Sequence, residues 1–216
     1  MTGSNVASRE WLRAALAAFP HRSLGALVSP GFHPFDLWGP LQMFGELSPA
    51  VSPVLVGSRD GPIASADGLM VVADIAMGES PRLDLLLIPG GGRSDESRAP
   101  ETLDWLRWQA ADAEIVMSVG DGARLLASTG LLDGRRATAN SDDLPSIAAD
   151  HIGVNWVSLA PWVGDGKFVT SSGGFVAIDM SLAVIARLAG ERVATTVADR
   201  TGYRWVHRPG LPEDVE

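Results

Sequence analysis

Two stretches of this sequence share one order of residues: an apolar run, a cluster of glycines, and then a helix pattern. Residues 83–88 lead into Pro89-Gly90-Gly91-Gly92, and residues 114–119 lead into Gly120-Asp121-Gly122. Short, nearly continuous apolar runs are typical of strands in a parallel sheet that helices cover on both faces. The two stretches therefore predict an open α/β sheet with glycine turns where strands pass into helices.

Further strands and helices alternate along the chain. We expect strands over 24–28, 52–57, 136–139 and 154–158 and from Gly166, helices over 100–111, 121–129 and 176–200 and after Pro40, and a hairpin arm over 68–73. Alternation of this kind predicts a doubly wound, mostly parallel α/β sheet with helices on both faces. The 216 residues are enough to bury one core.

A helix is expected ahead of this domain. Residues 8–19 carry apolar residues at helical spacing, Ser8 is a candidate N-cap, and Pro20 follows the predicted end. Such a helix packs on the domain or on a sister subunit, or it covers the site as a lid. The predicted organisation is an N-terminal helical extension, a single domain and a polar tail, over 1–22, 23–208 and 209–216.

Charge and composition argue against several classes of partner. The formal net charge of −9 disfavours nucleic acid and anionic membrane surfaces, since both attract basic proteins. No apolar run reaches the roughly 18 residues of a membrane span. The first ten residues lack a secretory signal pattern, so we expect a cytoplasmic protein. The absence of cysteine excludes a disulfide, a thiolate nucleophile and a Cys-ligated metal.

Four motifs occur in order along residues 23–200. They are Asp-Leu-Trp-Gly-Pro from Asp36, Ile-Pro-Gly-Gly from Ile88, the block from Ser118 to Thr138, and Ser-Ser-Gly-Gly-Phe-Val-Ala-Ile-Asp from Ser171. Together they resemble the ThiJ/PfpI superfamily, and most of all its isonitrile hydratase branch. The resemblance implies the class I glutamine-amidotransferase-like fold, a flavodoxin-like sandwich, and a homodimer.

The chain departs from this family at two positions. Gly120 stands where the family has its nucleophilic Cys, and Asn140 stands where relatives often carry a His. Thiol-protease, glutaminase and thiol-dependent hydratase chemistry are therefore unsupported.

Ligands of open α/β sheets bind beyond the carboxyl ends of the strands. Three loops are expected to meet there, over 33–40, 90–94 and 119–123. Gly91 and Gly92 allow backbone N–H groups to approach a substrate closely. Gly120 and Asp121 begin a helix whose free N–H groups favour negative charge. These groups resemble the family's oxyanion hole; a tight strand-to-helix turn is the alternative for the glycines.

Asp36 and Asp121 are the candidate catalytic residues. The apolar neighbours of Asp36 favour a raised carboxyl pKa, which suits a general acid or base. If both carboxylates share one pocket, one can be protonated while the other is ionised. The alternative for each is a helix N-cap.

Four nearby residues are candidates for substrate binding: His33, Phe35, Trp38 and Asn140. Trp38 also suits a core or interface position, and Asn140 also suits a surface turn. The four histidines show no metal-ligand spacing, and no dinucleotide or phosphate loop occurs, so we expect no metal and no cofactor.

Two functions remain open. The first is a cofactor-independent enzyme that acts on a small or medium organic substrate by acid/base chemistry, as a hydratase, dehydratase, isomerase or cyclase. The second is a catalytically inactive module of the same fold that binds a small molecule or a protein.

Overall fold

The computed structural model describes residues 2–59, 61–91 and 99–206. The predicted tail over 209–216 and the candidate oxyanion residue Gly92 lie outside the described residues. Within these ranges, no helix has both the length and the apolar character that crossing a membrane requires.

A seven-stranded sheet forms the centre, in the order β10-β11-β7-β6-β1-β2-β5. Its strands are β1 (Arg22–Val28), β2 (Val51–Gly57), β5 (Ile75–Ala76), β6 (Leu85–Ile88), β7 (Ile115–Val119), β10 (Trp162–Asp165) and β11 (Phe168–Ser171). Only β10 and β11 pair antiparallel in this sheet. The predicted doubly wound, mostly parallel sheet is confirmed.

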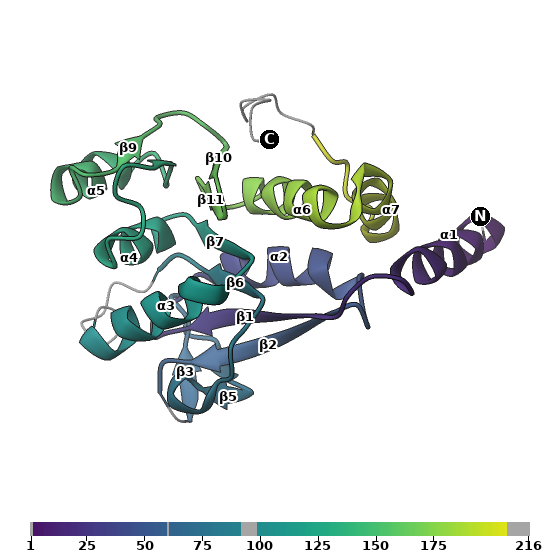
Figure 1. The fold of residues 1–216 in the computed structure, drawn as a ribbon, viewed down its shortest axis with the longest axis horizontal. Coiled ribbons are helices and arrows are strands. Elements are labelled where there is room, and N and C mark those ends of the chain that lie inside the picture. Colours follow the sequence, from purple (N-terminus) through teal and green to yellow (C-terminus); the bar gives the residue numbers. More distant parts are fainter. Residues whose placement is uncertain (1, 60, 92–98, 207–216) are drawn as a thin grey trace.

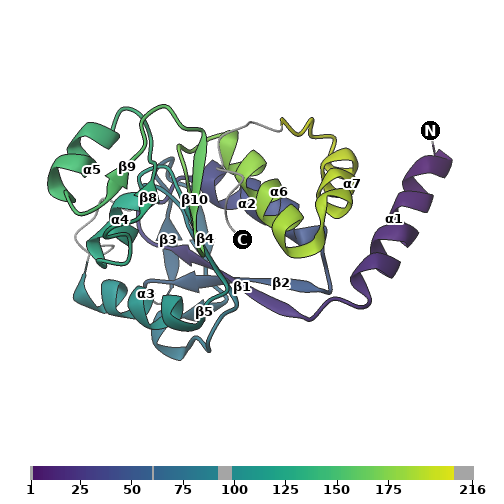
Figure 2. The same cartoon turned by 45° about the horizontal axis from the view of Figure 1, so that its top comes forward.

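Helices cover both faces of the sheet (Figures 1 and 2). One layer contains α2 (Pro34–Gly45), α6 (Val176–Ala189) and α7 (Glu191–Thr201), and the other contains α3 (Pro100–Asp112) and α4 (Gly122–Ser128). Alternate residues of each central strand point to the two layers: Met117 of β7 joins one buried apolar cluster and Val116 joins the other. This double burial explains why the strand sequences are apolar throughout.

Smaller strands and helices lie around the central sheet. The predicted hairpin arm is real: β3 (Pro62–Ala64) and β4 (Met70–Val72) pair antiparallel. A short helix η1 (Met77–Glu79) follows β5. Beyond α4, the parallel pair β8 (Arg136–Ala137) and β9 (Asn155–Trp156) flanks α5 (Leu144–Asp150), a helix that the sequence did not suggest.

The direction of winding reverses between β1 and β6. From β1 the chain moves to β2 on one side, whereas from β6 it moves to β7 and then β11 on the other. Such a reversal opens a crevice at the carboxyl ends of the two central strands, where open α/β sheets bind their ligands. The loops that follow β1, β6, β7 and β11 start at the carboxyl ends of these strands and border this crevice.

The N-terminal helix differs from its predicted bounds. Helix α1 spans Thr2–Leu16, so Ser8 lies inside it and is not its N-cap. Leu12 and Leu16 are buried against the α7 side of the core. Figure 1 shows α1 beyond the amino-terminal end of β1, away from the crevice, so α1 packs on the domain and does not cover the site.

Two other expectations about helices were wrong. The predicted helix over 176–200 is two helices, because Gly190 adopts φ 92° and ψ 152° between α6 and α7. The helix expected after Pro40 begins at Pro34 and contains Pro40. Proline at the first helical position lacks only an N–H that would have no helical partner.

Replacing Gly190 with alanine tests the break between α6 and α7. A side chain at this backbone conformation costs about 1–3 kcal/mol, so Gly190→Ala should lower the free energy of unfolding by that amount. Gly45→Ala is the control: Gly45 is exposed at the end of α2, and an added Cβ meets nothing within 4 Å. Urea unfolding measures both, and equal effects would show that Gly190 is not strained.

Candidate functional site

Asp36 is held in the crevice by the first turn of α2. Its carboxyl group is 5% exposed. One oxygen accepts a hydrogen bond from the Gly174 N–H, at 3.1 Å, and the other lies 3.5 Å from Nδ1 of His33. Because its oxygens face Gly174 and His33, Asp36 joins α2 to the turn that follows β11.

Burial raises the pKa of the Asp36 carboxyl above its ordinary value. Hydrogen bonds from the backbone N–H groups of Gly174 and Gly90, and the nearby His33, oppose this shift without cancelling it. A carboxyl group that keeps its proton to higher pH is suited to donate it near neutrality.

Asp121 is the second buried carboxylate, at 8% exposed. It occupies the N-cap position of α4, yet its side chain makes no capping hydrogen bond. Instead its Oδ1 accepts the N–H of Gly91 across the crevice, at 2.6 Å. The helix-capping alternative therefore does not describe Asp121, whose carboxylate is bound to the turn after β6.

The two carboxylates converge on Gly90. A Cβ placed on Gly90 would lie 2.6 Å from Oδ1 of Asp121 and 2.7 Å from Oδ2 of Asp36. Both oxygens therefore border one small space, which exists only because residue 90 has no side chain. The structure brings Asp36 and Asp121 together as neighbours, from two different helices.

Gly120 keeps a backbone conformation that side chains rarely adopt, with φ 57°. A Cβ here would lie 3.1 Å from Oδ2 of Asp36 and 3.9 Å from the Cα of Gly173. The position thus faces the Asp36 carboxyl group, and glycine supplies no nucleophile there.

The predicted oxyanion hole is only partly available. The Gly91 N–H is bound to Asp121, and the Gly120 N–H donates to the Ser171 carbonyl at 2.9 Å. Of the backbone N–H groups expected to form an oxyanion hole, those of Gly91 and Gly120 therefore have partners within the protein. At Gly91 the Asp121 carboxylate occupies the place that an external anion would take, whereas at Gly120 the partner is a backbone carbonyl of β11.

The candidate substrate-binding residues fall into two groups. His33, Phe35 and Trp38 are close to Asp36 in sequence at the start of α2, and all three are at least partly exposed. The Phe35 ring packs edge-on against Phe175, with ring centroids 4.8 Å apart, directly after the Gly174 that binds Asp36.

Asn140 belongs to a turn instead. Its side-chain oxygen accepts the Asp142 N–H at 3.1 Å, and its carbonyl accepts the N–H groups of Asp143 and Leu144 at the start of α5. The turn alternative describes these contacts, and none of them reaches Asp36 or Asp121.

Sequence reasoning missed three residues of the site: Gly90, Gly173 and Gly174. Gly90 separates the carboxylates, and the other two form the turn that binds Asp36. The available signal was the glycine pair one residue after the strand over 168–171, as Gly90 and Gly91 come one residue after β6.

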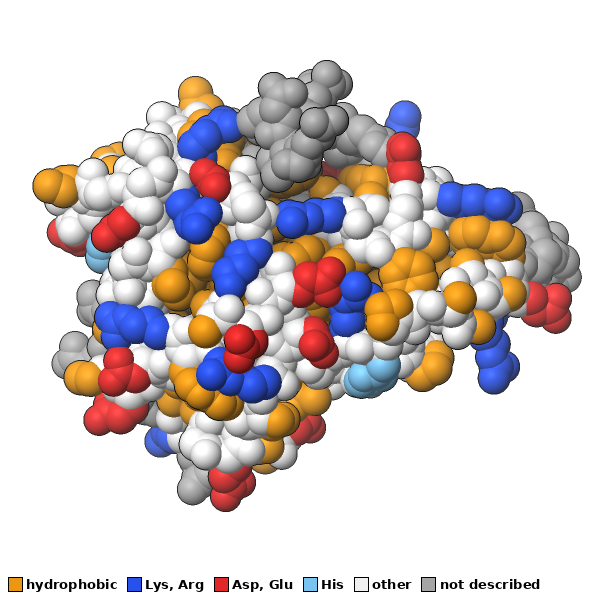
Figure 3. Space-filling model, in the orientation of Figure 1, with side chains coloured by type: hydrophobic (Ala, Val, Ile, Leu, Met, Phe, Trp, Pro, Cys, Tyr) orange, Lys and Arg blue, Asp and Glu red, His pale blue; other side chains and the backbone are white. Residues whose placement is uncertain are grey.

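Charged side chains do not form a single-sign surface on the visible face of the molecule. In Figure 3, Lys and Arg side chains alternate with Asp and Glu. Among residues 2–59, 61–91 and 99–206, no three His, Asp or Glu side chains are grouped closely enough to hold a metal ion.

The raised pKa of Asp36 predicts how stability depends on pH. Since the folded state holds this proton more tightly than the unfolded chain, the contribution of Asp36 to stability is fully present below about pH 4 and is lost as pH rises through the folded pKa. The Asp36→Asn variant has no ionisable group at this position. Its free energy of unfolding should therefore increase relative to that of the natural chain as the pH rises to neutrality. Urea unfolding at a series of pH values measures the difference; a difference independent of pH would contradict the prediction.

Replacing Gly90 tests the space between the carboxylates. The methyl group of Gly90→Ala would press on both oxygens and on the Val119 carbonyl, which is 3.1 Å away. We expect a loss of about 1–3 kcal/mol in the free energy of unfolding, typical of overpacking. Gly78→Ala is the matched control because its added methyl meets nothing within 4 Å. If the Gly90→Ala variant is as stable as the Gly78→Ala variant, the two carboxylates move apart freely and the prediction is wrong.

The sequence of this chain is similar to those of two characterised bacterial proteins. The chain is 34% identical over 184 residues to the isonitrile hydratase of Pseudomonas putida, covering 83% of this chain and 78% of the relative. It is 29% identical over 146 residues to the HTH-type transcriptional regulator CdhR of Pseudomonas aeruginosa, covering 68% of this chain but 43% of the regulator.

Solved structures agree on the fold. A ThiJ/PfpI family protein from Pseudomonas syringae superposes with a TM-score of 0.75 at 30% identity, covering 86% of this chain and 76% of that one. The model of the DJ-1/PfpI family matches residues 24–187, which is most of the sheet and all of the crevice turns. The chain belongs to the DJ-1/PfpI family.

Proposed function

We propose that this protein is a cofactor-independent enzyme that adds or removes water on a small organic substrate, with Asp36 and Asp121 as its acid/base pair. The observation that carries the proposal is the convergence of two buried carboxylates on Gly90. Burying carboxylates is costly, and the Asp121 side chain does not cap its own helix, so a role in the crevice accounts for its position. Isomerisation and cyclisation use the same proton transfers and belong to the same proposal.

The surroundings of the two carboxylates assign them different roles. Asp36, whose pKa is raised by burial, is the better suited of the two to act as the acid. Asp121, bound to the N–H of Gly91, acts as the base. Half-exposed His33, 3.5 Å from Asp36, connects the buried pair with solvent. Unequal environments for neighbouring carboxylates are what a divided acid and base require.

Isonitrile hydration is the reaction to test first, because a hydratase of that class is among the relatives. Asp36 protonates the terminal carbon of R–N≡C, while Asp121 removes a proton from water as its oxygen bonds to the same carbon. The product, R–N=CH–OH, moves its hydroxyl proton to nitrogen and becomes the formamide R–NH–CHO. The proton on Asp121 returns to Asp36 across Gly90, so one water is consumed and both carboxylates are restored.

Direct attack by water suits this site better than covalent catalysis. Gly120 has no side chain, and the Ser118 and Ser171 hydroxyls are fully buried within strands. None of these three described residues supplies a nucleophile, so in this proposal the nucleophile is water.

A non-catalytic binding module is the second candidate. It is favoured by the engaged N–H groups of Gly91 and Gly120, which leave fewer donors for a developing anion. Similarity to a transcriptional regulator also favours it, although that similarity spans less than half of the regulator.

Asparagine substitutions separate the two candidates. Formamide production from an alkyl isonitrile, followed by proton NMR, should fall by about 10²–10⁴-fold in Asp36→Asn and in Asp121→Asn, the usual contribution of a general acid or base. Asp179→Asn is the matched control: Asp179 is also buried, but it binds Tyr203 and the Val206 N–H instead.

The controls decide how each result is read. Circular dichroism should show the same fold in all variants. Turnover that survives both substitutions would overturn the acid/base proposal. A natural chain that binds the isonitrile without forming formamide would support the binding module.

A further inference from the structure

A second recess lies at the opposite end of α2 from the catalytic pair. It measures about 400 Å³ and is lined by α1, by the turn after α2 and by α7: Arg9, Glu10, Leu12, Arg13, Leu16, Glu46, Ser48, Pro49 and Arg200. Glu46 follows α2 directly, about 15 Å along the helix from Asp36. The recess is therefore separate from the crevice around Gly90.

The face of α1 that borders the recess is set by helical spacing. Arg9, Leu12, Arg13 and Leu16 recur at intervals of three and four residues, which places them on one side of a helix. Leu12 and Leu16 are buried and fix the helix to the core. In the contact between α1 and α7, the guanidinium of Arg192 on α7 also lies over the Trp11 ring of α1, 4.2 Å from its centroid.

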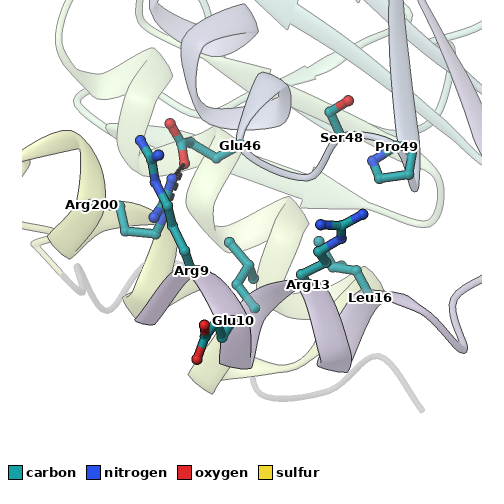
Figure 4. A pocket seen from close by; sticks show the side chains of 9 residues that line it. Arg9, Glu10, Arg13, Leu16, Glu46, Ser48, Pro49 and Arg200 are labelled. Atoms are coloured by element: carbon teal, nitrogen blue, oxygen red, sulfur yellow. Dashed lines mark hydrogen bonds and ion pairs between the residues drawn. The ribbon is translucent and has the colours of Figure 1, made fainter. Parts of the chain in front are cut away.

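The side chains that line the recess carry more positive than negative charge. Glu46 is neutralised by Arg200, whose Nη2 lies 2.6 Å from its carboxylate. Figure 4 shows Arg9 and Arg13 directed toward Glu46 and toward Ser48 and Pro49, while Glu10 points to the other side of α1. Within the described part of the chain, no ion pair involves Arg9 or Arg13, and Nη1 of Arg200 has no hydrogen-bond partner.

We propose that this recess binds an organic anion, a carboxylate or phosphate ester with a short apolar body. Guanidinium groups present forked donors that match the oxygens of both anions. Leu12, Leu16 and Pro49 supply apolar surface for the rest of the molecule, and the volume is typical of small-molecule sites.

The lining of the recess comes partly from inside and partly from outside the residues that the family model matches. The family match covers residues 24–187, whereas α1 and Arg200 lie outside it. All three arginines of the recess therefore come from segments beyond the matched domain.

Hexyl phosphate and inorganic phosphate are the probes for this site, measured by isothermal titration calorimetry on the full chain. Hexyl phosphate should bind more tightly than phosphate, because only it uses the apolar surface. The double variant Arg9→Gln/Arg13→Gln should weaken hexyl phosphate binding by about tenfold or more, since each charge-assisted hydrogen bond contributes that order. Both arginines are exposed, and unchanged circular dichroism will show that α1 remains folded.

Two control variants locate the binding. Arg107→Gln removes an equally exposed arginine from α3, and Asp36→Asn alters the crevice; both should bind hexyl phosphate as the natural chain does. A change in hexyl phosphate affinity in Asp36→Asn, in either direction, would place the anion in the crevice and overturn the proposal. So would an absence of binding to the natural chain, or equal binding by the double variant. None of these results depends on whether the protein hydrates isonitriles.

Discussion

Two carboxylates lie side by side inside this protein because the strand ends around them have no side chains. Gly90, Gly120 and Gly173 end three adjacent strands, and a Cβ on Gly90 or Gly120 would press on Asp36. Backbone N–H groups at these turns supply hydrogen bonds that a buried carboxylate needs. Steric room and hydrogen bonding thus come from the same residues, and the arrangement of the crevice follows from them.

The sheet order determines which turns meet. Because winding reverses between β1 and β6, the loop carrying Asp36 and the turn carrying Gly90 lie at one crevice, with β7 and β11 next to them. Helix α2 then connects this crevice to the recess lined by Arg9, Arg13 and Arg200. Asp36 lies in the first turn of α2, and Glu46 directly follows its last turn. One short helix therefore has a functional candidate at each end.

Much of the fold could be predicted because its causes are local. Apolar runs such as 114–119, ended by glycines, indicate strands buried on both faces, and the motif order identified the family. The break at Gly190 was missed because a glycine within a helical pattern does not show its φ angle. Likewise, the pairing of β10 with β11 and the bond between Asp121 and Gly91 join residues far apart in sequence, so no local pattern reveals them.

The glycine at position 120 has a consequence for the surroundings in which this site can work. A cysteine thiolate is converted by peroxide to sulfenic and then sulfinic acid, and the second step is generally irreversible. This chain contains no cysteine, and its crevice is made of carboxylates and backbone groups that do not undergo that oxidation. Oxidants that silence a thiol in the same fold therefore leave the groups of this crevice chemically unchanged.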